Sequence, residues 1–270
     1  MKTQDKLDAI VTKNNSLVCV GLDSDFSRLP RHLKELENPQ FEFNKAIVDA
    51  THDLVCAYKP NSAFYESRGE QGIHELKMTF DYINENYSEI VTILDAKRAD
   101  IGNTNNGYVS FIFDYLGADA VTLQPYLGSE ALKPFLDRED KGCIILCRTS
   151  NAGAGEFQDL AITSSTKQSQ PLYQHVAKNV VEKWNVNGNC LLVVGATYPQ
   201  ELAEVRKIAG NMTFLVPGVG AQGGEVEKIV KAGLNSKKAG MIINSSRDII
   251  FAENSREETI KLREEINRYR

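Results

Sequence analysis

The sequence has no uninterrupted apolar run of about 18 residues, the length that a membrane-spanning helix needs. Its first residues, MKTQDKLDAIVTKNN, lack the apolar centre of a secretory signal peptide. Positive charge is not in surplus either, because the sequence has 31 Lys and Arg residues and 36 Asp and Glu residues, which gives a net charge of −5. This balance argues against a nucleic-acid-binding surface. We therefore expect a soluble, cytoplasmic protein that binds neither membranes nor nucleic acid and holds any anionic ligand with a few local cations.

Cysteine pairs with the spacing of metal sites or redox motifs are also missing. None of the five cysteines forms a CxxC pair, and all of them lie in apolar stretches: Cys19, Cys56, Cys143, Cys147 and Cys190. An odd number of cysteines in such surroundings is typical of reduced thiols in the core of a cytosolic protein. We expect no disulfide framework.

Eight short apolar runs are spread evenly along the 270 residues. They are rich in Val, Ile, Leu and Cys and do not alternate with polar residues, which is typical of parallel strands covered on both faces. Segments with helical periodicity lie between them, for example residues 41–55, 72–87, 171–184 and 257–270. The repeat predicts a single-domain (β/α)8 barrel over residues 1–270, with a doubly wound open sheet as the alternative. The eight runs are residues 16–22, 53–58, 89–94, 119–124, 143–147, 190–196, 212–217 and 240–244.

Two connections, residues 24–39 and 148–170, are longer than the others. Both follow predicted strands, which in a barrel places them at the end where active sites lie. Loops of this length are usually lids or binding loops.

The expected strand ends carry lysines, arginines and carboxylates but no histidine. The four histidines, His32, His52, His74 and His175, all lie elsewhere, which disfavours histidine general-base catalysis and histidine metal sites. The polar strand-end positions are Asp23, Lys59, Asp95, Lys97, Gln124, residues 148–151, Thr197, residues 218–224 and residues 244–247.

The stretch LDAKRADIGNT, residues 94–104, follows an apolar run directly. Side chains two apart in a strand share a face, so Asp95 and Lys97 point the same way. Lys59 ends the neighbouring strand, which predicts an alternating charge network with Asp100. Such a network keeps lysines protonated, as proton donors and carbanion stabilisers. The alternative is that Asp100 is a helix N-cap and that Asp95 and Lys97 form an ordinary ion pair.

The stretch PGVGAQGG, residues 217–224, has glycines after the seventh strand, where barrels often bind phosphate against a helix N-terminus. Arg247, just past the eighth strand, can supply the cation, and Gln222 can cover the phosphate. The alternative is a tight turn without a ligand. The glycines in question are Gly218, Gly220 and Gly223.

Together, LDAKRADIGNT, Lys59, PGVGAQGG and Arg247 closely resemble the orotidine 5′-phosphate decarboxylase family, and TSNAGAGEFQD (149–159) suggests its longer bacterial subgroup. The resemblance runs from Asp23 to Arg247. It implies a (β/α)8 barrel that converts orotidine 5′-phosphate to UMP without a metal or organic cofactor, usually as a homodimer.

The resemblance also implies roles for particular residues. Lys97 would donate a proton to C6 of the pyrimidine, and Asp95 would orient the lysines. The implied catalytic residues are Lys59, Asp95, Lys97 and Asp100. The implied substrate-binding residues are Asp23, Ile101, Thr104, Ser150, Asn151, Gly220, Gln222, Gly223 and Arg247.

Within this implied set, Asp100, Ile101 and Thr104 would reach into the partner subunit's site. Asp23 and Lys59 would contact the ribose, and Gln222 and Arg247 the phosphate. Either Ser150 or Asn151 would read the edge of the pyrimidine; the sequence leaves open which of the two does so.

Two other functions share some of these features. Sugar-phosphate lyases of the same superfamily have the Asp-x-Lys-x-x-Asp string but use Mg²⁺, and they tend to carry an acidic residue where this chain has Lys59. A non-catalytic nucleotide-phosphate binder would keep the pocket without the chemistry.

An absorbance assay with orotidine 5′-phosphate in excess EDTA separates these functions. We expect full turnover with the chelator, because no step of the implied reaction needs a metal. Activity lost in EDTA and restored by Mg²⁺ would support the lyase, and binding without a spectral change would support the binder.

Overall fold

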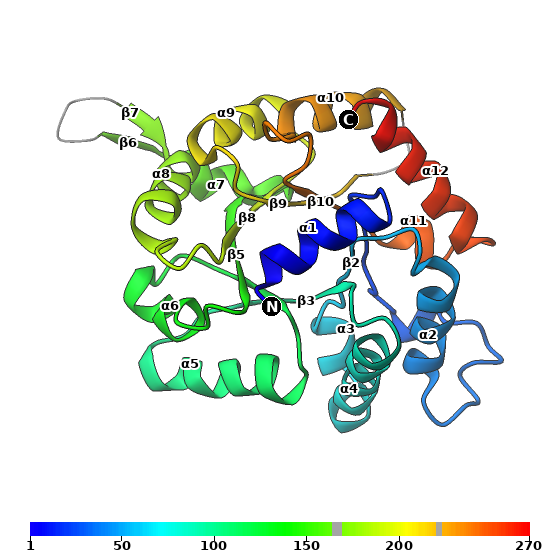
Figure 1. Cartoon of the computed structure of the whole chain (residues 1–270). Helices are drawn as coiled ribbons and strands as arrows, with labels where there is room; N and C mark the ends of the chain where they lie inside the picture. The colour runs from blue at the N-terminus through cyan, green and yellow to red at the C-terminus, as the bar shows by residue number, and fades with distance from the viewer. Residues whose placement is uncertain (164–168, 220–222) are drawn as a thin grey trace.

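The computed structural model describes residues 1–163, 169–219 and 223–270, and its centre is a closed barrel of eight parallel strands (Figure 1). The barrel closes because β1 (Val18–Val20) pairs with both β2 (Ala57–Tyr58) and β10 (Met241–Ser245). This closure confirms the (β/α)8 barrel and excludes the open, doubly wound sheet. The other barrel strands are β3 (Val91–Arg98), β4 (Ala120–Leu123), β5 (Gly142–Arg148), β8 (Cys190–Val194) and β9 (Phe214–Pro217).

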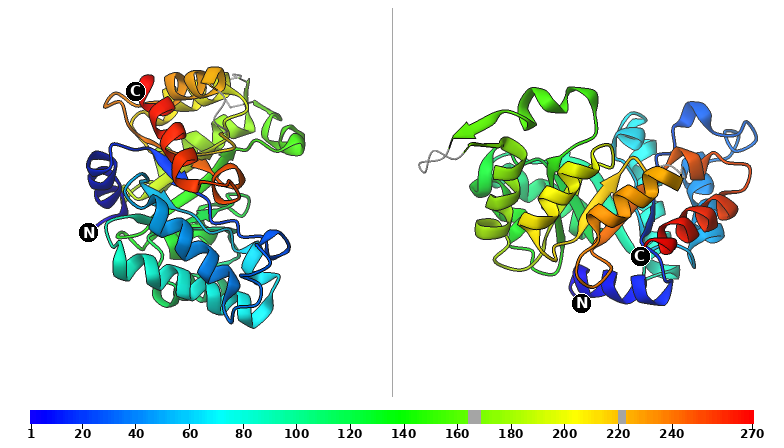
Figure 2. Two further views of the ribbon diagram at one scale, coloured as in Figure 1. Left: turned by 90° about the vertical axis from the view of Figure 1, so that its right-hand side faces the viewer. Right: turned by 90° about the horizontal axis from the view of Figure 1, so that it is seen from above.

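Helices follow the strands and cover the outside of the barrel (Figure 2). The helix expected over 41–55 is α2 (Pro39–Thr51), which begins earlier because proline suits the first turn of a helix. The other expected helices are α4 (Gly69–Asn86), α8 (Leu172–Asn179), continued by the π-helical turn η4 (Val180–Trp184), and α12 (Ser255–Arg268). The remaining helices are α1 (Thr3–Lys13), η1 (Phe26–Arg28), α3 (Ala63–Glu66), α5 (Gly102–Val109), η2 (Ser110–Tyr115), α6 (Gly128–Leu136), η3 (Ala152–Ala154), α7 (Gly155–Gln158), α9 (Pro199–Ala209), α10 (Gly223–Gly233) and α11 (Arg247–Ile250).

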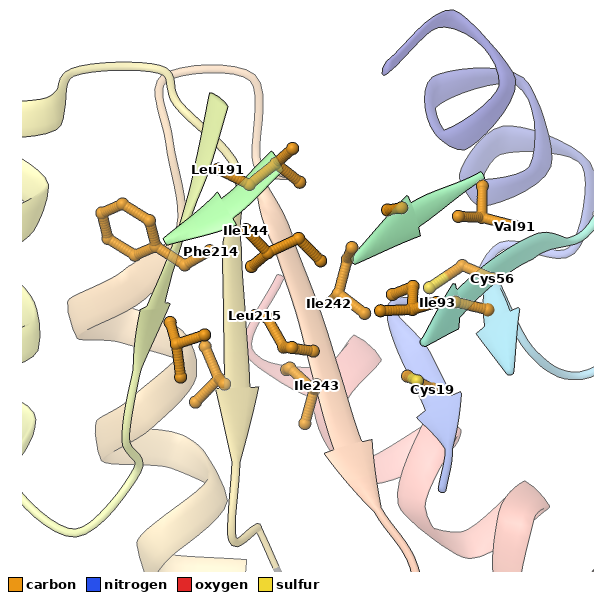
Figure 3. Close-up of a cluster of buried hydrophobic side chains, with 14 of the residues drawn as sticks. Cys19, Cys56, Val91, Ile93, Ile144, Leu191, Phe214, Leu215, Ile242 and Ile243 are labelled. Atoms are coloured by element: carbon orange, nitrogen blue, oxygen red, sulfur yellow. The ribbon is translucent and has the colours of Figure 1, made fainter. Parts of the chain in front are cut away.

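The core is one cluster of buried side chains that extends in sequence from Leu7 to Ile266. Figure 3 shows part of it on the barrel strands, with Leu215 and Ile243 on β9 and β10 and Ile93 on β3. This continuity leads us to propose that residues 1–270 form a single domain.

The five cysteines lie in this core and are all free, as expected. Burial raises the pKa of the Cys19, Cys147 and Cys190 thiols to about 12. They therefore stay protonated and unreactive near neutral pH.

Helix α1 closes the end of the barrel where the strands begin. The Thr3 hydroxyl donates to the backbone carbonyls of Asp119 and Asp140, at 2.8 and 3.0 Å, and Lys6 Nζ lies 2.6 Å from the Asp119 carboxylate. Helix α1 does not cover the opposite end of the barrel, where the strands finish and where a functional site is expected. In the described part of the chain no helix is long and apolar enough to cross a bilayer.

The long connection after β5 contains a small antiparallel pair, β6 (Ala161–Thr163) and β7 (Ser169–Pro171), which projects from the body of the molecule (Figure 1). Residues 164–168 of this connection lie outside the described ranges. The connection after β1 carries η1 and a series of turns before α2 begins.

Candidate functional site

A cavity of about 330 Å³ lies where the barrel strands finish. It is lined by residues from five of the strand ends, among them both charged and small polar side chains. Its volume is within the usual range for small-molecule sites. The lining residues are Asp23, Lys59, Asp95, Pro217, Gly218, Val219, Asn244, Ser245, Ser246, Arg247 and Asp248.

A larger cavity of about 400 Å³ lies at the other end of the barrel, beside α1. Its lining residues include Asp8, Lys237 and Arg270, but none of these three forms an ion pair within the described ranges. Paired, buried charge is concentrated at the smaller cavity, which makes it the candidate site.

The Asp95 carboxylate is the centre of the site. One of its oxygens, Oδ2, lies 3.0 Å from Lys59 Nζ, and the other, Oδ1, lies 2.6 Å from Lys97 Nζ. The Thr122 hydroxyl donates to Oδ1 at 2.8 Å, and Asn61 Nδ2 donates to Oδ2 at 3.4 Å. Four groups on three strands or their ends thus hold one carboxylate, and three members of the expected network of Lys59, Asp95, Lys97 and Asp100 come together here.

Burial and pairing act in opposite directions on the charges of this cluster. Burial alone would raise the pKa of Asp95, but the Lys59 and Lys97 ammonium groups outweigh it and hold the pKa well below its ordinary value. Burial alone would lower the pKa of Lys59, but the Asp95 and Asp23 carboxylates outweigh it and raise the pKa. Asp95 and Lys59 therefore both stay charged throughout the neutral range.

Lys97 reaches Asp95 by a route that strand alternation does not predict. Its φ angle is +47°, a left-handed conformation that is uncommon outside glycine, and the pairing of β3 with β4 shifts register between Leu94 and Arg98. Its backbone N–H donates to the Thr122 hydroxyl at 3.0 Å, which fixes the bulge. The shared face of Asp95 and Lys97 therefore depends on a bulge, whereas the expectation was a regular strand.

Asp100 lies apart from the Asp95 cluster within this chain. It is half-buried, and its carboxylate accepts a hydrogen bond from the Ile101 backbone N–H at 2.6 Å. The alternative role of Asp100 as a helix N-cap is wrong, because the N-cap of α5 is Ile101. Buried Asn105, which sequence reasoning missed, holds the Asp100 backbone by accepting from its N–H and donating to its carbonyl.

Ile101 and Thr104 are both exposed beside Asp100, and the Ile101 side chain is 61% accessible. Neither lines the cavity of its own chain. Their position leaves them free to meet another molecule.

Asp23 enters the cavity beside Lys59. Its Oδ1 is buried and has no hydrogen-bond partner among the described residues, so it is an acceptor that a ligand hydroxyl could satisfy. Ser150 does not line the cavity, but a Cβ on Gly218, which does, would be 3.8 Å from the Ser150 Oγ. Asn151 is exposed, and its Oδ1 accepts from the Thr149 hydroxyl at 2.7 Å.

The end of the cavity where the sequence predicts phosphate binding is described in part. Arg247 begins α11, lines the cavity and is exposed, with no ion pair in the ranges that the structure covers. Gly218 has a φ of +85°, which glycine adopts without strain, and α10 begins at Gly223. Gly220 and Gln222 lie outside the described residues.

Several polar residues of the site were not found from the sequence. Thr122 sits inside an apolar run, where a single threonine gives no signal of its contact with Asp95. Asn61, two residues after Lys59, could have been noticed because it shares that lysine's side of the strand. Of the residues lining the cavity next to Arg247, Ser245 and Ser246 fall within the expected strand-end positions 244–247, and Asp248 was missed.

A parallel barrel with a buried lysine–carboxylate cluster at the carboxyl ends of its strands defines a (β/α)8-barrel enzyme. Residues 16–262 match the family model described as "Orotidine 5'-phosphate decarboxylase / HUMPS family". The chain belongs to this family.

Individual relatives carry the same name. The chain is 46% identical to the orotidine 5′-phosphate decarboxylase of Cellvibrio japonicus, over 97% of each chain. It is 47% identical to that of Flavobacterium johnsoniae, over 98% of this chain and 97% of the relative. Among solved structures, the orotidine 5′-monophosphate decarboxylase of Leishmania donovani superimposes with a TM-score of 0.88 at 38% identity, covering 100% of this chain and 98% of the other.

Replacing Asp95 with Asn tests the charge cluster through stability. The pKa of Asp95 is lowered on folding, so its contribution is present above the unfolded value of about 3.9 and is lost as the pH falls below it. We expect D95N to lower the free energy of unfolding by about 3 kcal/mol or more at pH 7, because Lys59 loses its buried partner. The difference from wild type should shrink below about pH 4.

Denaturant midpoints recorded across this pH range measure the effect. D137N is the control, because Asp137 pairs with Lys133 on the surface and should contribute less than about 1 kcal/mol. A D95N midpoint equal to wild type at pH 7 would contradict the account of the cluster.

Proposed function

We propose that the cluster around Asp95 decarboxylates orotidine 5′-phosphate to UMP, the last step of UMP synthesis. The chain is a carboxy-lyase, as its family and its relatives along nearly their whole length indicate. The observation that supports this mechanism best is the position of two ammonium groups, Lys59 and Lys97, on either side of one buried carboxylate in the cavity.

The chemistry needs a stabilised carbanion. Loss of CO2 breaks the bond between C6 and the carboxyl carbon and leaves the electron pair on C6, in the plane of the ring. The Lys97 ammonium stabilises this charge and then transfers a proton to C6, and the neutral amine regains a proton from solvent. Asp95 holds Lys97 in place before the reaction, so little reorganisation is needed when the charge develops.

Two further effects add to carbanion stabilisation. An Asp100 carboxylate about 4 Å from the substrate carboxylate would contribute roughly 4 kcal/mol of repulsion at an effective dielectric of about 20. The most demanding enzymatic reactions need about 20 kcal/mol in total, so repulsion is not the main contribution. Among the contributions to lowering the activation barrier, binding of the remote phosphate with loop closure over the substrate is second, after carbanion stabilisation and ahead of repulsion.

The substrate would lie along the cavity with its ribose near Asp23. The unpartnered Oδ1 of Asp23 suits a ribose hydroxyl, and Lys59 stands beside it. Ser150 lies near Gly218 and is better placed than exposed Asn151 to read the pyrimidine edge. Asn151 would support Ser150 by accepting a hydrogen bond from the neighbouring Thr149 hydroxyl. Arg247 would bind the phosphate, together with Gly220, Gln222 and Gly223, whose roles rest on the sequence resemblance.

A Mg²⁺-dependent lyase fits this site less well. Asp95, the carboxylate that a metal would use, is already flanked by two ammonium groups. A divalent cation there would meet like charge on both sides.

We also propose a homodimer with shared active sites. The loops after β3 and β4 lie side by side and expose large apolar side chains, with Ile101 at 61%, Tyr126 at 84% and Leu127 at 45% accessibility. A second copy of the chain would cover them and bring Asp100, Ile101 and Thr104 to the partner's cavity. The five reduced thiols support a cytoplasmic location.

Lys97→Ala tests the proton donor. We expect kcat to fall by about 10⁴-fold or more, since one change removes both the acid and the electrostatic stabiliser. Binding of 6-azaUMP, which needs no proton transfer, should remain measurable by calorimetry. K133A, at an exposed lysine paired with Asp137, is the control and should keep full activity. Near-normal turnover by K97A would end the assignment.

Mixed dimers test the shared site. K97A and D100N should each be inactive alone, because each spoils both sites of its own dimer. After unfolding and refolding of an equal mixture, half of the dimers are hybrids with one intact site, so activity should return to about a quarter of wild type. No recovery, with hybrids confirmed by mass spectrometry, would mean that each site is built from one chain.

A further inference from the structure

Arg148, at the end of β5, is a buried cation that the proposed mechanism does not use. It is only 4% exposed, and its guanidinium lies 4.9 Å from the centre of the Tyr198 ring and 5.9 Å from that of Tyr173. Its Nε is buried without a partner among the described residues. Burying a charge in this way is costly unless the rest of the side chain is held by specific contacts.

The polar contacts of the Arg148 guanidinium go to the loop that follows β5. The guanidinium donates to Gln158 Oε1 at 3.3 Å and lies 3.3 Å from the Asp159 carboxylate. Gln158 Oε1 also accepts from the Thr149 backbone N–H at 2.8 Å, and Gln158 Nε2 donates to the Thr149 hydroxyl at 2.8 Å. Arg148 therefore helps to tie the start of the loop, at residue 149, to residues 158–159.

The loop is also confined from the β8 side. The Gly195 backbone N–H donates to the Arg148 carbonyl at 2.7 Å, and a Cβ on Gly195 would lie 2.8 Å from Ser150 Cβ and 2.9 Å from its backbone nitrogen. No other residue than glycine fits there without moving Ser150. Ser150 is thus held between the Arg148 network and Gly195, with its Oγ near Gly218, which lines the cavity.

We propose that Arg148 is a positioning residue for recognition of the pyrimidine base: acting through Gln158 and Thr149, it fixes Ser150 in the place from which it reads the base. This inference rests on the proposed role of Ser150. Arg148 does not line the cavity, so its proposed effect on the base is indirect. This role requires the planar guanidinium group of arginine, because a lysine keeps the charge but cannot bridge Gln158 and Asp159 in the same geometry.

Two ligands separate base recognition from the rest of the site. UMP carries base, ribose and phosphate, whereas ribose 5-phosphate lacks the base. We expect R148K and R148Q to weaken UMP binding by about tenfold, the loss of roughly one well-placed hydrogen bond, and to leave ribose 5-phosphate binding unchanged. Calorimetry on the intact enzyme measures both dissociation constants.

The matched control is R206K. Arg206 is a half-buried arginine over an aromatic ring, 3.7 Å from the centre of Phe214, but it donates to backbone carbonyls where the strands begin, far from the cavity. Its replacement should lower the melting temperature without changing either dissociation constant. Should R148Q fail to fold, Gln158→Leu and Gly195→Ala disturb Ser150 from opposite sides and should give the same selective loss.

A double-mutant comparison with Ser150→Ala completes the test. If S150A selectively weakens UMP and R148K has no further effect in that background, Arg148 acts through Ser150. If S150A is selective but R148K and R148Q are not, or if they weaken both ligands equally, the positioning role is wrong while the assignment of Ser150 stands. If S150A itself has no selective effect, the assignment of Ser150 fails, and the inference fails with it.

Discussion

The mouth of this barrel depends on one carboxylate between two ammonium groups. Lys59 is 3% exposed and Asp95 is 9% exposed, so neither charge could stay in the protein without the other. Lys97, which is more exposed, pairs with the same carboxylate. Lys59 and Asp95 are thus fixed in the barrel wall, and Asp95 holds the Lys97 ammonium beside them.

The loops around this cluster are held by buried polar groups, which makes the site rigid from several directions. Behind Asp23, the Tyr65 hydroxyl donates to the Leu22 carbonyl at 2.8 Å and accepts from the Ser24 hydroxyl at 3.1 Å, so both neighbours of Asp23 are fixed. Arg148 does the same for the loop after β5. Such supporting contacts keep catalytic groups near their productive geometry before the substrate arrives.

Much of the fold and part of the site could be predicted from the sequence. Continuous apolar runs identify buried parallel strands, and a lysine or aspartate at the end of such a run is expected at the mouth of the barrel. Lys59 and Asp95 could therefore be predicted from the sequence. The left-handed backbone of Lys97 was not, because local sequence does not report a bulge that depends on Thr122 in the next strand. Contacts such as that of Asn105 with the Ala131 carbonyl are set by tertiary structure alone.

The backbone at Lys97 has a consequence for the whole chain. A residue other than glycine at a φ of +47° costs on the order of 1–3 kcal/mol, and the fold bears this cost at a position where glycine or asparagine would relieve it. The native protein is therefore less stable than its own architecture permits. Selection for stability alone would favour glycine or asparagine here, and the proton-donating role proposed for Lys97 would account for the lysine.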